Sequence, residues 1–226
     1  MLLFELCLTV FPIYASAMTS ESPAGIDIDN VTKWIHGHTS AAGELQFQLV
    51  THGRSNLTYI VSDEKENRWV LRRPPTGHVL ASAHDMGREF RIISALQETR
   101  VPVPSALGMC EDAAITGAPF FVMGFVDGYI VKDVEDSRAF SPEERRVQSE
   151  SLVDVLAELH AIDPEEVGLG SLGKKEDYVG RQLRRWKRQV DEGSDRELPL
   201  FNALHAKLEK GKPEQIGSGI THGDYR

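Results

Sequence analysis

Three short runs rich in β-forming residues stand close together early in the chain, and they restrict the possible folds more than any other feature. They cover residues 45–50, 57–61 and 68–72, and the segments between them are short, polar and turn-rich. Connections this short join antiparallel strands, because parallel strands need a long crossover. The sequence therefore predicts an antiparallel meander in this region.

The next segment predicts one helix and two more strands. Phe90, Ile93 and Leu96 recur at helical spacing, which favours a helix over about 83–99. The Val-Pro-Val-Pro run at 101–104 forces an extended chain that leads into a strand ending at Cys110. Residues 111–118 are predicted to be a turn, and residues 119–126 a buried strand. Together these runs predict a five-stranded antiparallel meander with one helix after its third strand.

Beyond Asp127 the pattern is helical until the last residues. Ser141 followed by Pro142 and two acids is typical of a helix start. Further helices are predicted over about 174–190 and 198–210. We expect an α+β fold in three parts: an N-terminal extension and linker at 1–26, a β-rich lobe at 27–126, and a helical lobe at 127–226.

Composition excludes some classes of protein. The chain has 226 residues, 41% of them hydrophobic, which suits one large domain or two small lobes. A net charge of −9 argues against a nucleic-acid partner. Its two cysteines are too few for a disulfide framework, and neither has metal-ligand spacing.

The first 17 residues are apolar and end in Ala-Ser-Ala, which resembles a signal-peptidase site. They lack a basic start and contain Glu5 and Pro12, so we favour an upstream extension or a misassigned start over a working signal. No other segment is apolar enough to cross a membrane. The expected location is cytoplasmic, with secretion through residues 1–17 as the alternative.

Several motifs in order resemble the aminoglycoside-phosphotransferase-like family, from about residue 30 to residue 226. They are YIVSDEKENRWVLRRPP, AHDMGREFRIISAL, VPVPSALGMCED, GAPFFVMGFVDG and ITHGDYR. The series is most similar to bacterial phosphotransferase-family proteins and to the kinase-like domain of acyl-CoA dehydrogenase fusion proteins. The resemblance implies a two-lobed, protein-kinase-like fold with a five-stranded N-lobe sheet and a helical C-lobe. It also implies an ATP-dependent transfer of phosphate to a hydroxyl group of a small molecule.

Three predicted nucleotide-binding residues lie in the loop between the first two strands. Gly53 lets the backbone approach a phosphate, and Ser55 and Asn56 can donate hydrogen bonds. Taken alone, this loop is equally an ordinary hairpin turn.

The resemblance also places a phosphate-binding cation at Arg72 and a helical glutamate at Glu89 that would hold it. Because side chains alternate along a strand, Arg73 would face the opposite side of the sheet. The alternative is that both arginines are solvated. Met123 would lie at the back of an adenine pocket, and the backbone of residues 124–126, around Phe125, would meet the adenine edge. The same apolar run suits the core of almost any fold.

Asp224 is the predicted catalytic residue, positioned by a turn at His222 and Gly223. The resemblance gives it the role of orienting the acceptor hydroxyl, with Mg²⁺ as the second cofactor. The Asn and Asp expected to bind Mg²⁺ would follow Arg226, so no metal ligand is assigned in this chain. We expect an incomplete C-lobe and a truncated form with weak or no activity alone.

The alternative to this enzyme is a non-catalytic nucleotide-binding or interaction module. The substrate stays open among a sugar, a choline-like alcohol, a homoserine and a hydroxyacyl-coenzyme A. The oligomeric state is not indicated by the sequence, and no membrane partner is expected.

Overall fold

The computed structural model describes residues 2–3, 23–50, 56–77, 85–131, 133–223 and 225. These residues form two compact units. Residues 23–158 belong to one, which we call the sheet unit, and residues 159–225, with Leu2 and Leu3, belong to the other, the helical-hairpin unit. The lobe boundary expected near Asp127 stays a prediction.

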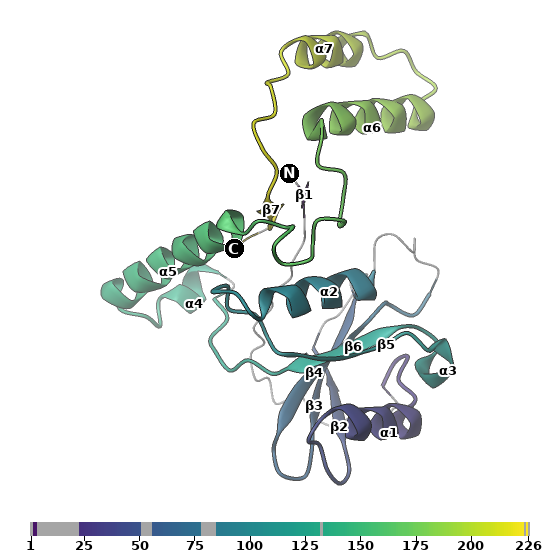
Figure 1. Cartoon of the computed structure of the whole chain (residues 1–226), viewed down its shortest axis with the longest axis vertical. Coiled ribbons are helices and arrows are strands. Elements are labelled where there is room, and N and C mark those ends of the chain that lie inside the picture. The colour runs from purple at the N-terminus through teal and green to yellow at the C-terminus, as the bar shows by residue number, and fades with distance from the viewer. Residues whose placement is uncertain are drawn as a thin grey trace. The chain divides into compact units, whose positions relative to one another are not determined.

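The sheet unit contains five paired strands and most of the helices (Figure 1). Its strands are β2 (Gln46–Leu49), β3 (Leu57–Ser62), β4 (Arg68–Arg73), β5 (Ala106–Cys110) and β6 (Phe120–Gly124). Its helices are α1 (Ile28–His38), α2 (Met86–Leu96), α3 (Ala113–Thr116), α4 (Val134–Ser137) and most of α5 (Pro142–Ala161). Every predicted strand is therefore present, within a few residues of its predicted ends.

All pairings in this sheet are antiparallel, and the strand order is β2-β3-β4-β6-β5. The meander prediction holds for β2, β3 and β4 but is wrong for the last two strands. After β4, the chain passes through α2 to β5 at the edge, and β6 then returns between β5 and β4. The residues of β6 are apolar or glycine throughout, because this strand lies between β4 and β5 and is covered on both faces of the sheet.

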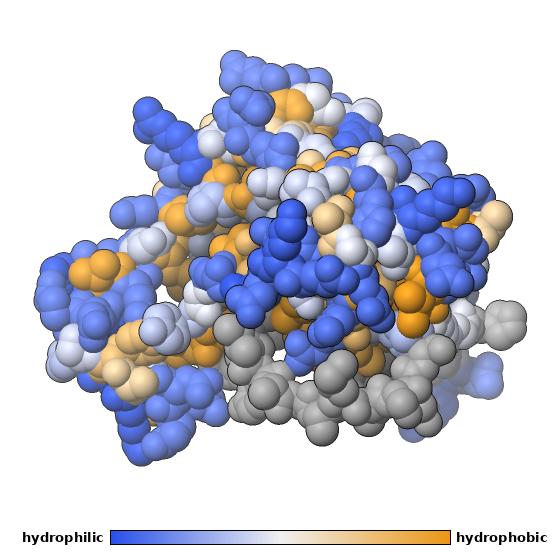
Figure 2. All heavy atoms as spheres, turned by 90° about the horizontal axis from the view of Figure 1, so that it is seen from below, coloured by the Kyte–Doolittle hydropathy of each residue, from blue (hydrophilic) through white to orange (hydrophobic). Residues whose placement is uncertain are grey.

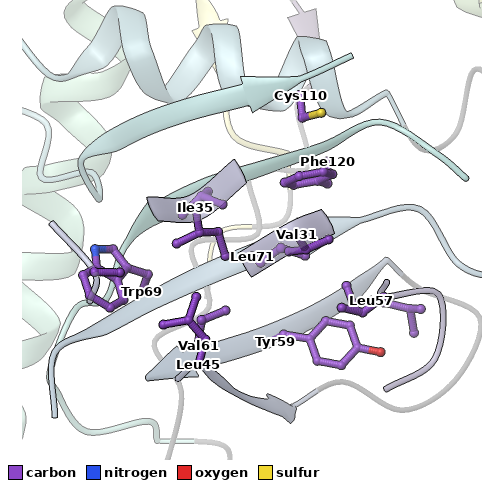
Figure 3. Close-up of a cluster of buried hydrophobic side chains, with 13 residues drawn as sticks. Val31, Ile35, Leu45, Leu57, Tyr59, Val61, Trp69, Leu71, Cys110 and Phe120 are labelled. Atoms are coloured by element: carbon purple, nitrogen blue, oxygen red, sulfur yellow. The ribbon is translucent and has the colours of Figure 1, made fainter. Parts of the chain in front are cut away.

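One face of the sheet packs against α1 (Figure 3). Asp27 caps this helix by accepting from the backbone N–H of Asn30 at 3.0 Å. The cluster on this face is fully buried at its centre. Its central members are Val31, Ile35, Tyr59, Val61, Leu71, Phe120 and Val122. The strand members come from alternating positions of the three neighbouring strands β3, β4 and β6, so they share the face that Val31 and Ile35 of α1 cover.

The other face of the sheet packs against α2, which contacts β5 and β6. The Phe90 ring of this helix lies 5.9 Å from the Phe121 ring of β6, centroid to centroid. The alternating positions Val70, Arg72 and Met123 are on this second face, because Val70 pairs with Met123 and Arg72 with Phe121. This face carries the polar residues of the predicted site.

The segment before α1 is anchored to the sheet unit through backbone carbonyls. The Tyr59 hydroxyl donates to the Ala24 carbonyl at 2.7 Å, and the Thr116 hydroxyl donates to that of Gly25. Gly25 has φ +70°, and a Cβ there would collide with the Arg73 guanidinium. Arg73 is only 4% exposed and donates to the Thr116 carbonyl at 3.1 Å, so it is not solvated, and burial lowers its pKa.

One local prediction needs correction, and one short helix was missed. Residues 111–118 are not only a turn: Asp112 accepts from the N–H of Ala114 at 2.9 Å and caps the short helix α3, which ends at Gly117 in the left-handed region (φ +79°). Helix α4, capped by Asp133, was not predicted at all. Four-residue helices carry too little periodicity to be seen in sequence.

The helical-hairpin unit contains α6 (Tyr178–Gly193) and α7 (Pro199–Lys210), which pack on each other. It also contains the end of α5 and a two-stranded parallel sheet of β1 (Leu2–Leu3) and β7 (Ile220–Thr221). Helix α6 begins four residues after the predicted start at 174. Residues 174–177 instead form a loop, in which the Lys175 carbonyl accepts a hydrogen bond from the Gln215 side chain.

Asp177 joins the two ends of the α6–α7 hairpin. Its carboxylate accepts from the Lys212 ammonium at 2.5 Å and from the Arg184 guanidinium at 2.8 Å. The backbone N–H of Tyr178 donates to the side chain of Gln215 at 3.0 Å beside it. Asp177 has φ +48°, a strained value for a non-glycine residue, and these contacts hold it there.

The charge on Asp177 makes this hairpin sensitive to acid. The hydrogen bonds from Lys212 and Arg184 lower the pKa of Asp177 to about 2. A carboxyl with a lowered folded-state pKa stabilises the fold above its unfolded pKa, near 3.8, and loses that effect as the pH falls toward about 2. We expect Asp177→Asn to unfold at lower urea concentration than the wild type at pH 7. The difference between the two urea midpoints should shrink as the pH falls from about 4 to about 2. An equal difference at all pH values would contradict this account.

In the described part of the chain, no helix combines the length and the apolar composition that a membrane crossing requires. Figure 2 shows a mainly hydrophilic face with separate apolar patches between the polar side chains. The expected cytoplasmic location stays a prediction.

Candidate functional site

An ion pair between β4 and α2 is the centre of the candidate site. The Nε atom of Arg72 lies 3.4 Å from Oε2 of Glu89, and the two side chains are 10% and 26% exposed. Two buried or half-buried charges of opposite sign hold each other more firmly than an exposed pair does. The predicted contact between Arg72 and Glu89 is therefore formed, and the alternative that Arg72 and Arg73 are both solvated is wrong.

Asn56 belongs to the same cluster. Its side-chain amide donates to Oε1 of Glu89 at 2.8 Å, and the residue is 8% exposed. Glu89 thus uses one carboxylate oxygen for Arg72 and the other for Asn56, which fixes the orientation of all three groups. Gly53 and Ser55, the other two predicted residues of this loop, lie outside the described residues. Their role at the nucleotide stays a prediction.

The start of α2 explains why Glu89 is held at this place. The Asp85 side chain accepts from the N–H of Arg88 at 2.9 Å, and the Asp85 carbonyl accepts from the N–H of Glu89 at 3.1 Å. Asp85 is therefore the N-cap, and Glu89 stands in the first helical turn. A carboxylate is favoured there by the helix dipole.

Removing this cap should loosen the Arg72–Glu89 pair without touching either residue. We expect Asp85→Ala to lower the free energy of unfolding by about 1 kcal/mol, the usual effect of a lost N-cap. Asp85→Asn, which keeps a capping oxygen, should lie within a few tenths of the wild type. Urea unfolding measures both variants, and equal losses in both would show that the cap is not the cause.

The predicted base-binding residues lie on the same sheet face, toward the end of β6. Met123 is 5% exposed and pairs with Val70 of β4, two residues before Arg72. Sequence reasoning overlooked Val70, although strand alternation alone places it on the face of Arg72. Phe125 follows the end of β6 and is half-buried.

One detail of the predicted adenine edge is corrected by the structure. The backbone N–H of Gly124 donates to the carbonyl of Ser105 at 2.8 Å, so it is already in use. The contact of the adenine edge with the other backbone groups of residues 124–126 stays a prediction.

The segment around the predicted catalytic residue lies in the helical-hairpin unit. Asp224 itself lies outside the described residues. His222 is 5% exposed, and its ring packs edge-on against Tyr225 with centroids 5.0 Å apart. Gly223 has φ +87°, which a residue with a side chain rarely adopts. This backbone conformation is compatible with the turn predicted at His222 and Gly223, but that turn, the role of Asp224 and its convergence with Arg72 stay predictions.

The structure does not add a metal site to this cluster. In the ranges described above, no group of three or more His, Cys, Asp or Glu side chains is placed to hold a metal ion. Arg72 is the cation that the site offers for an anionic ligand.

Comparison with known proteins agrees with the fold. Residues 46–226 match the phosphotransferase enzyme family. A candidate aminoglycoside phosphotransferase from Ralstonia eutropha has a similar structure, with a TM-score of 0.73 and 30% identity over 88% of this chain and 58% of its own. Macrolide 2'-phosphotransferase from Brachybacterium faecium shares the fold at 19% identity, with a TM-score of 0.55, over 88% of this chain and 65% of its own.

The chain belongs to the phosphotransferase enzyme family and has its α+β, kinase-like fold. Among curated proteins, acyl-CoA dehydrogenase family member 10 of mouse is 34% identical over 200 residues, or 88% of this chain. This alignment covers 18% of the mouse protein. The chain therefore corresponds to a small part of that relative.

Proposed function

We propose that this protein binds ATP and acts in the transfer of its γ-phosphate to a hydroxyl group of a small molecule. The observation that carries the proposal is the Arg72–Glu89 ion pair, completed by Asn56. A guanidinium can contact a phosphate while a carboxylate fixes its direction. Membership of a phosphotransferase family and the kinase-like fold support the same reaction class.

Each part of the site has a distinct role in this proposal. Arg72 binds and orients the phosphate chain, while Glu89 and Asn56 keep the guanidinium from rotating away. Val70 and Met123 give the adenine an apolar surface, and Phe125 borders its edge. Asp224 orients the acceptor hydroxyl for attack on phosphorus. Gly53 would let the backbone approach the phosphates, and Ser55 would donate a hydrogen bond to them.

Mg²⁺ would neutralise charge that develops on the transferred phosphate. The ligands that the resemblance implies for it, an Asn and an Asp after Asp224, are not among the 226 residues. Nucleotide binding and phosphate transfer should therefore be measured separately. Arg72 is able to bind a nucleotide in this chain, whereas transfer is best measured in a version extended by the corresponding segment of a relative.

Calorimetry of ATP binding, with and without Mg²⁺, tests the first step. We expect this chain to bind ATP, and the extended chain to bind Mg·ATP more tightly and to hydrolyse or transfer its γ-phosphate. An extended chain that binds Mg·ATP but transfers no phosphate to any alcohol would favour a non-catalytic nucleotide-binding module. Absence of ATP binding in both chains would refute the proposal.

The names of the relatives suggest acceptors for the transfer assay. Solved relatives are described as aminoglycoside and macrolide phosphotransferases, and the curated relative as an acyl-CoA dehydrogenase family member. We propose a small-molecule alcohol as the acceptor. Aminoglycosides, simple amino alcohols and a hydroxyacyl-coenzyme A should be compared in one assay.

A further inference from the structure

Arg68, at the first position of β4, makes two contacts with the segment that follows β6. Its Nη2 atom lies 2.6 Å from Oδ1 of Asp127, and its guanidinium carbon lies 4.1 Å from the centroid of the Phe125 ring. We call Arg68, Phe125 and Asp127 the clasp. Its ion pair is exposed on the Asp127 side, where the side chain is 74% accessible, and more covered at Arg68, at 30%.

The clasp lies next to the end of the strand pairing between β4 and β6. Strand pairing between β4 and β6 ends with Trp69 opposite Gly124, and β6 itself ends at Gly124. The residues that follow are therefore outside the ladder of strand hydrogen bonds. The ion pair and the cation–π contact from Arg68 bind them back to the sheet.

Arg68 also stands in line with the rest of the candidate site. Side chains alternate along β4, so Arg68, Val70 and Arg72 share one sheet face. Arg68 and Arg72 are four residues apart, which is about 13 Å along a strand at about 3.3 Å per residue. That length fits an extended nucleotide, with its base near Val70 and Phe125 and its phosphates at Arg72.

We propose that Arg68 is a positioning residue for the base of the nucleotide. Through Asp127 and Phe125 it fixes the segment whose backbone would meet the adenine edge, and it makes no contact with phosphate. This inference rests on the proposed ATP binding and adds a residue that determines how the base, rather than the triphosphate, is bound. The role predicts an effect that depends on the presence of the base.

Two ligands separate this role from a general effect on the fold. Calorimetry should compare ATP with inorganic tripolyphosphate, which carries the phosphates without the base. In Arg68→Met, we expect the dissociation constant of ATP to rise about fivefold, or about 1 kcal/mol, while that of tripolyphosphate stays unchanged. Arg68→Lys, which keeps the charge over the ring, should recover part of the ATP affinity.

Asp127→Asn is the matched variant, because an exposed side chain is replaced and folding is not at risk. Asp127→Asn should weaken ATP binding to a similar degree. The double variant Arg68→Met/Asp127→Asn should bind ATP no more weakly than Arg68→Met, because both substitutions remove the same Arg68–Asp127 ion pair. Unchanged ATP affinity in Arg68→Met, or an equal loss for ATP and tripolyphosphate, would overturn the inference. A wild-type chain that binds neither ligand would overturn the proposed function and this inference with it.

Discussion

Replacing Arg72 by methionine is expected to weaken ATP binding by about 30- to 100-fold, which corresponds to about 2–3 kcal/mol. The substitution removes the cation for the phosphates. It also removes the positive charge that lies 3.4 Å from the Glu89 carboxylate, a side chain that is 26% exposed. The unneutralised carboxylate would then repel the triphosphate. Calorimetry of ATP binding at one fixed salt concentration measures the loss, because phosphate contacts weaken with salt.

The neighbouring arginine offers a matched control. Arg73→Met should destabilise the fold, because Arg73 is buried against carbonyl groups on the opposite sheet face, but the folded variant should bind ATP like the wild type. Glu89→Gln keeps an amide oxygen for Asn56 and loses only the charge, so an intermediate loss is expected. Wild-type affinity in Arg72→Met would refute the assignment of Arg72 as the phosphate-binding cation.

The second large effect concerns the core on the α1 face. We expect Leu71→Ala to lower the free energy of unfolding by about 2–5 kcal/mol, the range for removing a fully buried leucine. Leu71 is 0% exposed and belongs, with Val31 and Tyr59, to the cluster of Figure 3. Urea unfolding followed by circular dichroism measures the change.

Leu200 of α7 is the control for the same substitution. It is 87% exposed, so Leu200→Ala should change the free energy of unfolding by less than about 0.5 kcal/mol. A comparable loss in both variants would mean that Leu200 is covered in solution. A small loss in Leu71→Ala alone would mean that the core repacks around the cavity.

The parts of the fold that sequence could predict are those encoded locally. Strand alternation and turn residues located β3 and β4, and helical spacing located α2. The pairing of Arg72 with Glu89, in contrast, was predicted from the resemblance to a known family. The order of β5 and β6 could not be predicted, because it depends on which strand edge β6 joins, and that is decided by packing between distant segments. Whether Arg73 is buried depends in the same way on Gly25 and Thr116, which are far from it in sequence.

The start of α6 shows the same limit. Residues from Lys174 onward have good helical propensity, yet Gln215 accepts from the N–H of Tyr178 and also donates to the Lys175 carbonyl at 2.7 Å. Contacts with a segment about 40 residues away thus override the local preference. For the predicted roles of Gly53, Ser55 and Asp224, the sequence remains the only guide.

The carbonyl contacts of Ala24 and Gly25 affect how this protein can be divided or fused. The sheet unit includes residues ahead of α1, because the hydroxyl groups of Tyr59 and Thr116 donate hydrogen bonds to the carbonyl oxygens of Ala24 and Gly25. A recombinant version that starts at the first turn of α1 would remove the acceptors of the Tyr59 and Thr116 hydroxyl groups. It would also uncover the Arg73 guanidinium, which packs against Gly25. Any affinity tag, or any neighbouring domain in a larger natural polypeptide, is therefore best joined ahead of Pro23.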